Sequence, residues 1–221
     1  MEASATSRKR SSPERTRTND PERTKAELLA VATEEFATFG FSGARVDAIA
    51  ERTRTSKRVI YYYFGGKEGL YLAVLEKVYA DVRAIEEGLN LDAFEPEEAL
   101  RRLIEQTFEN DDAHVEFVRL VAIENIHHAK HLAKAPSIRQ INLRALQVIG
   151  RILARGQATG LFRDDLEAVD VHMAISALCF FRVANRYTFS EIFGVDLSEP
   201  ERRARHKKMI ADAVLALVRK S

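Results

Sequence analysis

The amino-acid sequence predicts an all-α fold, on three observations. The 221-residue chain contains only 10 Gly and 5 Pro, which leaves little turn-forming chemistry for an all-β or doubly wound α/β fold. Apolar residues recur at the three- and four-residue spacing of helix faces along most of the chain, and no strand-like alternation of useful length is visible. Hydrophobic residues make up 46% of the chain, enough for the core of one or two domains.

The first 20 residues are expected to form a disordered basic tail, because they lack apolar residues that a core could bury. The tail is either a solvated leader or an arm that contacts phosphates. From Pro21 the pattern becomes helical, with Asp20 as the N-cap and Pro21 in the first turn, and Gly40 is expected to end this helix. The apolar face of the first helix is Leu28, Leu29, Ala32, Phe36 and Phe39.

Two short helices and a long one are expected next. The short helices cover 46–53 and 57–64, with Thr55 or Ser56 capping the second of them. Lys67 then opens a long helix after two glycines. The remaining chain is expected to be helical over 97–109, 113–133, 136–158, 168–193 and 199–219.

The short helices have the spacing of a helix-turn-helix, in which the second helix enters the major groove of DNA. The charge pattern favours the same function. Net charge over the whole chain is only +1, but residues 1–71 carry 13 Lys and Arg against 10 Asp and Glu, and the other 150 residues carry 21 against 23. The stretch from Arg52 to Lys67 contains five cations and no acid, as expected of a surface that meets phosphates.

The segment IAERTRTSKRVIYYYFGGKEGLY, from Ile49 to Tyr71, resembles the signature of the TetR family of bacterial one-component repressors. That signature reads roughly I-A-x-x-A-G-V-S-x-G-x-L-Y-x-Y-F-x-x-K-E-x-L. The matching positions are Ile49, Ala50, Ser56, Ile60, Tyr61, Tyr63, Phe64, Lys67, Glu68 and Leu70. Arg54 stands where the family usually has the turn glycine, so this residue must accept a left-handed conformation or the turn must differ.

The resemblance implies base contacts for Lys57 and Arg58, and arginine suits guanine because it pairs with O6 and N7. It implies phosphate contacts for Lys67, where the helix N-terminus adds backbone amides, and for the hydroxyl-bearing residues around the third helix. Ile49, Ile60 and Phe64 are then core. The predicted DNA-binding residues are Arg45, Thr55, Ser56, Lys57, Arg58, Tyr61, Tyr62 and Lys67.

For the rest of the chain, residues 69–221, the resemblance implies a helical ligand-binding and dimerisation domain, after a helix-turn-helix domain over 21–68. The expected partners are a palindromic double-stranded DNA operator, a second copy of the chain and a small-molecule inducer. The last two helices would form the dimer interface. The apolar stripe expected on the final helix is Met209, Ile210, Ala213, Val214 and Leu217.

A polar stripe in the apolar stretch 115–132 suggests a ligand site. Glu124, His128 and His131 fall on one helical face beside Phe117, and buried polar groups need partners. Three interpretations stay open: a ligand, a structural network among these side chains or with Arg144 or Arg182, and a metal ion. The predicted ligand-binding residues are Phe117, Glu124, His128, His131, Arg182 and Asn185.

The segment from about 123 through RVANRYTFSEIFG also resembles regulators of aromatic or N-heterocyclic acid catabolism of the nicotinate-degradation type. This resemblance implies an anionic aromatic inducer, with Arg182 and the histidines as its partners.

Composition also limits the expected cellular location and the expected function classes. A single cysteine, Cys179, excludes an intramolecular disulfide, and no run of ~18 apolar residues could cross a bilayer, so a cytoplasmic location without membrane contact is expected. No cofactor, metal or enzymatic activity is predicted, since no nucleophile–base pair or complete metal set is visible. The alternatives are a metal-dependent enzyme on a helical bundle and an architectural DNA-binding protein without a ligand.

Overall fold

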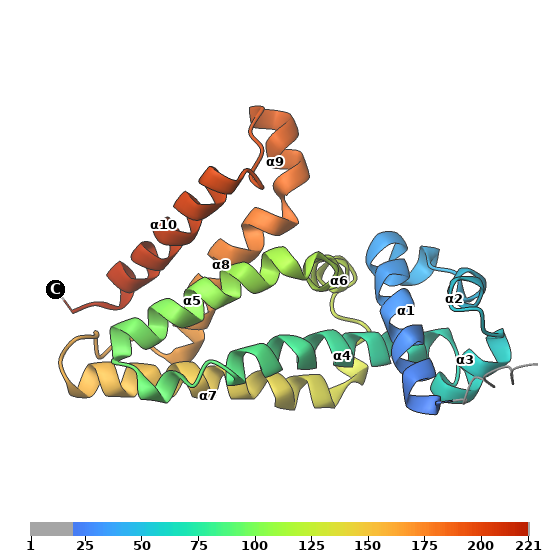
Figure 1. Ribbon diagram of the computed structural model, residues 1–221. Helices are drawn as coiled ribbons and strands as arrows, with labels where there is room; N and C mark the ends of the chain where they lie inside the picture. Colours follow the sequence, from blue (N-terminus) through green and yellow to red (C-terminus); the bar gives the residue numbers. More distant parts are fainter. Residues whose placement is uncertain (1–19, 221) are drawn as a thin grey trace, which may run out of the picture.

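The computed structural model describes residues 20–220, and in this range the chain is helical without a β-strand (Figure 1). The helices are α1 Pro21–Gly43, α2 Val46–Arg52, α3 Lys57–Phe64, α4 Lys67–Glu87, α5 Pro96–Ala113, α6 Val115–Ile126, α7 Pro136–Ala158, α8 Ala168–Ala184, α9 Arg186–Phe193 and α10 Pro200–Val218, with short 3-10 turns η1 Leu91–Ala93 and η2 Leu132–Lys134. The all-α prediction is therefore confirmed. The tail predicted for residues 1–20 lies, apart from Asp20, outside the described residues.

The first helices begin and end largely where local chemistry predicts. The Asp20 carboxylate accepts hydrogen bonds from the backbone N–H groups of Glu22 and Arg23, at 3.1 and 3.2 Å. Gly40 adopts φ 67°, which kinks α1, and one further turn continues to Gly43. The placement of Phe39 on the buried face is wrong, because its side chain is 58% exposed.

Two apolar cores hold the chain together. The first joins α1 to α4 around the buried Phe36, Ile49, Ile60 and Tyr71, and the second joins α5, α7, α8 and α10. Figure 1 shows α4 leaving the small N-terminal group of helices and running into the bundle beside α7, in the same direction as α7. A single rigid element thus belongs to both halves of the molecule.

Two long helices predicted from the sequence are shorter in the structure. The helix expected over 113–133 ends at Ile126, and the helix expected over 168–193 breaks at Asn185 into α8 and α9. The α8–α9 pair is bent by 64° and would have the length and composition of a membrane span only if its two parts are taken together; no single helix in the described range has both.

Candidate functional site

The first candidate site is the outer face of α3, held by one buried side chain. Ile60 is fully buried against α1 and α4, so the opposite side of α3 faces outward. Tyr61 and Tyr62 are 53% and 82% exposed, and Lys57 and Arg58 are exposed as well. Positions 57 and 58 are the first two of the helix, which is the end that reaches base edges in a helix-turn-helix.

The turn between α2 and α3 contains a residue in a left-handed conformation. Arg54 has φ 52°, so the arginine adopts the geometry for which the TetR signature uses glycine. The backbone N–H of Thr55 donates to the Ala50 carbonyl at 2.9 Å, and the Thr53 and Thr55 hydroxyls lie 3.0 Å apart. Arg54 therefore accepts the left-handed conformation itself, and the turn does not need a different geometry.

Other predicted phosphate and base ligands lie at the ends of the helices that flank α3. Lys57 forms an ion pair with Asp47 of α2, and the exposed Arg45 is the N-cap residue of α2. Ser56 is the N-cap residue of α3, but its side chain makes no capping hydrogen bond. The Lys67 ammonium lies 3.2 Å from the Ser42 carbonyl oxygen and 5.1 Å from the centre of the Phe41 ring.

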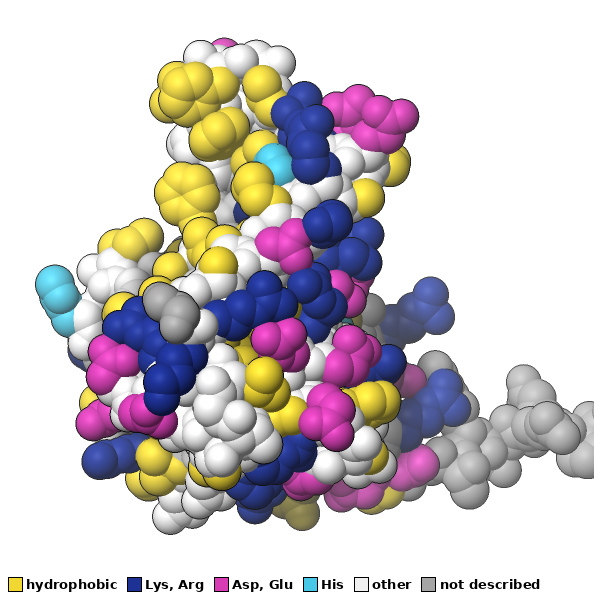
Figure 2. Space-filling model, turned by 90° about the vertical axis from the view of Figure 1, so that its left-hand side faces the viewer, with side chains coloured by type: hydrophobic (Ala, Val, Ile, Leu, Met, Phe, Trp, Pro, Cys, Tyr) yellow, Lys and Arg dark blue, Asp and Glu magenta, His cyan; other side chains and the backbone are white. Residues whose placement is uncertain are grey.

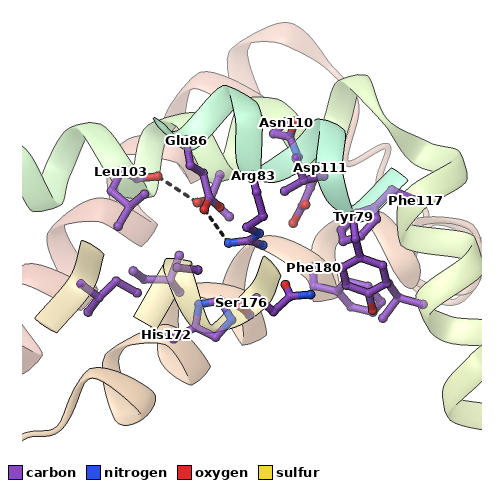
Figure 3. A pocket seen from close by; sticks show the side chains of 17 residues that line it. Tyr79, Arg83, Glu86, Leu103, Asn110, Asp111, Phe117, His172, Ser176 and Phe180 are labelled. Atoms are coloured by element: carbon purple, nitrogen blue, oxygen red, sulfur yellow. Dashed lines mark hydrogen bonds and ion pairs between the residues drawn. The ribbon is translucent and has the colours of Figure 1, made fainter. Parts of the chain in front are cut away.

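The second candidate site is a cavity of about 180 Å³ among α4, α5, α6, α7 and α8 (Figure 3). Its aromatic wall is formed by Tyr79, Phe117 and Phe180, with the first two rings edge to face at 5.2 Å between centroids. Its other polar side chains come from four helices and are Arg83, Glu86, Thr107, Asn110, Asp111, Asn142, His172 and Ser176. Small-molecule sites have this character, an apolar cavity with a few placed polar groups.

Burial shifts the titration of the acids and the histidine in the cavity. It raises the pKa of Asp111 to about 7, although the positive charges of Arg182 and Arg83 oppose the shift. It also raises the pKa of Glu86, against the opposing effect of its partner Arg83, and lowers the pKa of His172. The imidazole of His172 is therefore neutral at pH 7.

Of the six predicted ligand residues, only Phe117 lines the cavity. Glu124 and His131 instead form a buried hydrogen-bonded cluster, here called the Glu124 cluster, at the junction of the two halves. The Glu124 carboxylate accepts from the Tyr71 hydroxyl at 2.9 Å and from the backbone N–H groups of His131 and Leu132 at 3.1 Å each, and it lies 3.0 Å from His131 Nδ1. This is the structural network that the sequence analysis left open.

The other three predicted ligand residues lie elsewhere. His128 follows the end of α6, has φ 56° and is exposed, so its placement on a helical face with Glu124 is wrong. Arg182 is buried, but its Nη2 lies 2.5 Å from Asp112 Oδ1, away from the cavity wall. Asn185 ends α8 and donates to the Phe181 carbonyl at 3.2 Å. No group of three or more metal-ligating side chains occurs within residues 20–220.

Sequence reasoning missed Arg83, Asn110 and Asp111. The polar triplet 110–112 suggested a helix boundary, whereas α5 continues to Ala113. A usable signal was present, because Asp111 extends the four-residue and three-residue spacing of the buried Ile104 and Phe108.

A third feature is an exposed apolar face on α8 and α10. Figure 2 shows hydrophobic side chains gathered on the protruding part of the molecule that α8, α9 and α10 form in Figure 1. On the final helix the predicted stripe divides, since Ile210 and Val214 are buried within the chain and Ala213 is exposed. The exposed large apolar residues on these two helices are Val169, Met173, Leu178, Phe181, Met209 and Leu217.

Comparison with known proteins agrees with this arrangement. The repressor NicS of Pseudomonas putida is 37% identical over 204 residues, which are 92% of this chain and 96% of NicS. The repressor SCO4008 of Streptomyces coelicolor is 31% identical over 74% of this chain and 80% of its own length. The structure of the ketosteroid transcriptional regulator KstR2 of Mycobacterium tuberculosis superposes with a TM-score of 0.66 at 23% identity, covering 89% of this chain and 95% of KstR2.

Two family models account for most of the described chain. The model for bacterial regulatory proteins of the tetR family matches residues 28–74, which include α2 and α3. The model for the tetracyclin repressor-like C-terminal domain matches residues 96–214, which include most of the cavity. These matches are to transcriptional regulators and not to enzymes. Together with the helix-turn-helix geometry of α2 and α3, they show that the chain belongs to the TetR family of bacterial transcriptional regulators.

Proposed function

We propose that this chain is a repressor that binds a palindromic operator through α3 and leaves it when a small molecule fills the cavity. The observation that carries the proposal is the course of α4. Its first turn packs against α3, while Tyr79 and Arg83 further along the same helix line the cavity. A ligand that favours one position of α4 would therefore change the position of α3, and would release DNA if it binds the DNA-incompetent arrangement more tightly.

In this proposal Lys57 and Arg58 contact the base edges and so recognise the operator sequence. Arg58→Ala should weaken operator binding by ~5- to 150-fold, which corresponds to the loss of one bidentate base contact. Binding to unrelated duplex should fall much less, because that binding rests on phosphates. Fluorescence anisotropy at fixed salt, with an operator obtained by genomic selection, measures both affinities.

Arg102→Ala is the matched control for Arg58→Ala. Arg102 is also on a helix surface but is paired with Glu98 in the bundle, so the control removes the same charge far from α3. Equal losses of specific and nonspecific affinity in Arg58→Ala would remove the base-reading role. Phosphate contact is proposed for the other predicted DNA-binding residues, and their replacement should reduce both affinities together.

Members of this family act as dimers, and we assign the dimer interface of this chain to the exposed face of α8 and α10. Met173 and Phe181 are 66% and 53% exposed, and apolar patches of this kind mark protein contacts. The double variant Met173→Glu, Phe181→Glu should be monomeric in sedimentation experiments and should bind the palindrome weakly. Ile126→Glu, at an equally exposed apolar position on α6, should stay dimeric. A dimeric double variant would refute the assignment.

The size of the cavity supports an inducer with one ring. Its volume of about 180 Å³ is close to the ~150 Å³ of an engineered cavity that takes up benzene. The aromatic or heterocyclic part of the inducer expected from the sequence is kept in this proposal. The acid part loses its support, because Arg182, His128 and His131 do not line the cavity.

A further inference from the structure

The cavity contains a buried acid without a partner. Asp111 is 5% exposed, and no hydrogen bond or ion pair to its carboxylate is found anywhere between residues 20 and 220. Figure 3 shows the Asp111 side chain pointing into the cavity between Arg83 and Tyr79. Buried polar groups in folded proteins almost always have a partner, so the missing donor is expected to come from whatever occupies the cavity.

The cations near Asp111 are already engaged with other acids. Arg83 lies within the cavity wall but is ion-paired with Glu86, and both side chains are only about a tenth exposed. Arg182 contacts Asp112 at 2.5 Å instead of Asp111. Asp112 is shared by Arg182 and Arg203, so part of the Arg182 charge also acts on Asp111, but neither arginine bonds to the Asp111 carboxylate. Asp111 is therefore the acid of the cavity wall that has no direct partner, and an anion placed against it would be disfavoured.

The rest of the cavity wall is suited to an organic cation that carries an aromatic ring. The faces and edges of Tyr79, Phe117 and Phe180 line one side of the cavity, and aromatic faces attract organic cations. Two further buried atoms in the wall, Arg83 Nε and Asn110 Oδ1, have no hydrogen-bond partner within the described chain. They could hold a second polar group of the same ligand.

We infer that the cavity binds a single-ring organic cation whose protonated nitrogen pairs with Asp111 and whose ring lies against Tyr79, Phe117 and Phe180. The inference rests on the proposed function, in which the ligand of this cavity controls release of DNA. It replaces the anionic inducer expected from the sequence with one of opposite charge.

Binding of such a ligand should strengthen as pH rises. The groups that face Asp111 are Arg83 and Glu86 on α4, Asp112 on α5, and His172, Cys179 and Arg182 on α8, while α10 reaches it only through Arg203 on Asp112. Burial lowers the pKa of His172 and raises that of Cys179 to about 12, so both stay neutral near pH 7. Because the pKa of Asp111 is raised to about 7, ionised Asp111 should become ~10-fold more abundant between about pH 6 and about pH 8.

The test compares benzylammonium with benzoate as probes of equal ring size, by calorimetry on the full-length protein without DNA. Wild-type protein should bind benzylammonium more tightly than benzoate at about pH 8, and the preference should fall ~10-fold at about pH 6. Asp111→Asn should abolish both the preference and its pH dependence. Asp81→Asn is the matched control, with the same charge change at an exposed position of α4 where Asp81 pairs with Lys77, and should keep both.

A measurement of thermal stability distinguishes a ligand-binding role of Asp111 from a purely structural one. Removal of an unpartnered buried charge should raise the melting temperature of the ligand-free Asp111→Asn protein at about pH 8, whereas Asp112→Asn should lower it by breaking the pairs with Arg182 and Arg203. Tighter binding of benzoate, or an unchanged preference in Asp111→Asn, overturns the inference. Failure of the purified protein to select any operator would instead overturn the proposed function, since calorimetry does not depend on DNA.

Discussion

Glu124→Leu is expected to destabilise the protein by about 3–9 kcal/mol, because three donors lose their acceptor in a dry environment and each unsatisfied group costs ~1–3 kcal/mol. The donors are the Tyr71 hydroxyl and the backbone N–H groups of His131 and Leu132, around a carboxylate that is 1% exposed. Losses of this size are a large share of the stability of an ordinary domain. Urea unfolding followed by circular dichroism measures the change.

The conservative variant Glu124→Gln separates hydrogen bonding from packing. It keeps one oxygen acceptor and the side-chain volume, so it should lose clearly less stability than Glu124→Leu. Equal losses in both variants would show that charge, and not the acceptor geometry, holds the Glu124 cluster together.

The titration of Glu124 gives a pH dependence of known sign. Burial alone would raise its pKa, but the hydrogen bonds from Leu132, Tyr71 and His131 outweigh burial and lower the pKa below the ordinary 4.5. The folded state therefore favours the ionised form more than the unfolded state does. Its contribution should be complete above about pH 4.5 and be lost as the pH falls through the lower folded-state pKa, and Glu124→Gln should not show this loss.

Gly69→Ala is the second change with a large expected effect. A Cβ at position 69 would lie 1.9 Å from the Phe64 carbonyl oxygen, so α3 and the start of α4 could not keep their contact. Overpacking of this kind typically costs ~1–3 kcal/mol. Because Phe64 is the last residue of α3, the strain would also move α3 itself. Operator affinity should therefore fall more than affinity for unrelated duplex.

Gly150→Ala is the matched control within α7. There the nearest atom to the added Cβ is that of Ala168 at 3.8 Å, which is an ordinary contact. Because alanine is favoured over glycine inside a helix by roughly 0.5–1 kcal/mol, this variant should be at least as stable as wild type and should bind DNA normally. Thermal unfolding measures the stability of both variants, and fluorescence anisotropy measures their affinity for DNA. A Gly69→Ala protein with normal stability and normal operator affinity would contradict the close-contact argument.

The sequence by itself determined the helical class, the DNA-reading segment and the first boundaries. Asp20, Gly40 and Gly65 act through their own backbone or side chain within a few residues, and the 3.6-residue period places Ile60 inward while Lys57 and Arg58 face outward. Such features depend on chemistry local to one helix. The family signature in this segment was therefore sufficient to predict the helix-turn-helix.

Only the tertiary structure decided where the cavity of the bundle lies and which polar groups line it. Glu124 meets Tyr71 across 53 residues of sequence, and Asp111 faces Arg83 because α4 and α5 happen to pack with those positions together. The break after Ile126 removed His128 from the face on which the sequence placed it. Helical periodicity says which side of a helix is buried, but the partner across the interface is set by where helices end and by how they cross, and neither follows from residues in one helix.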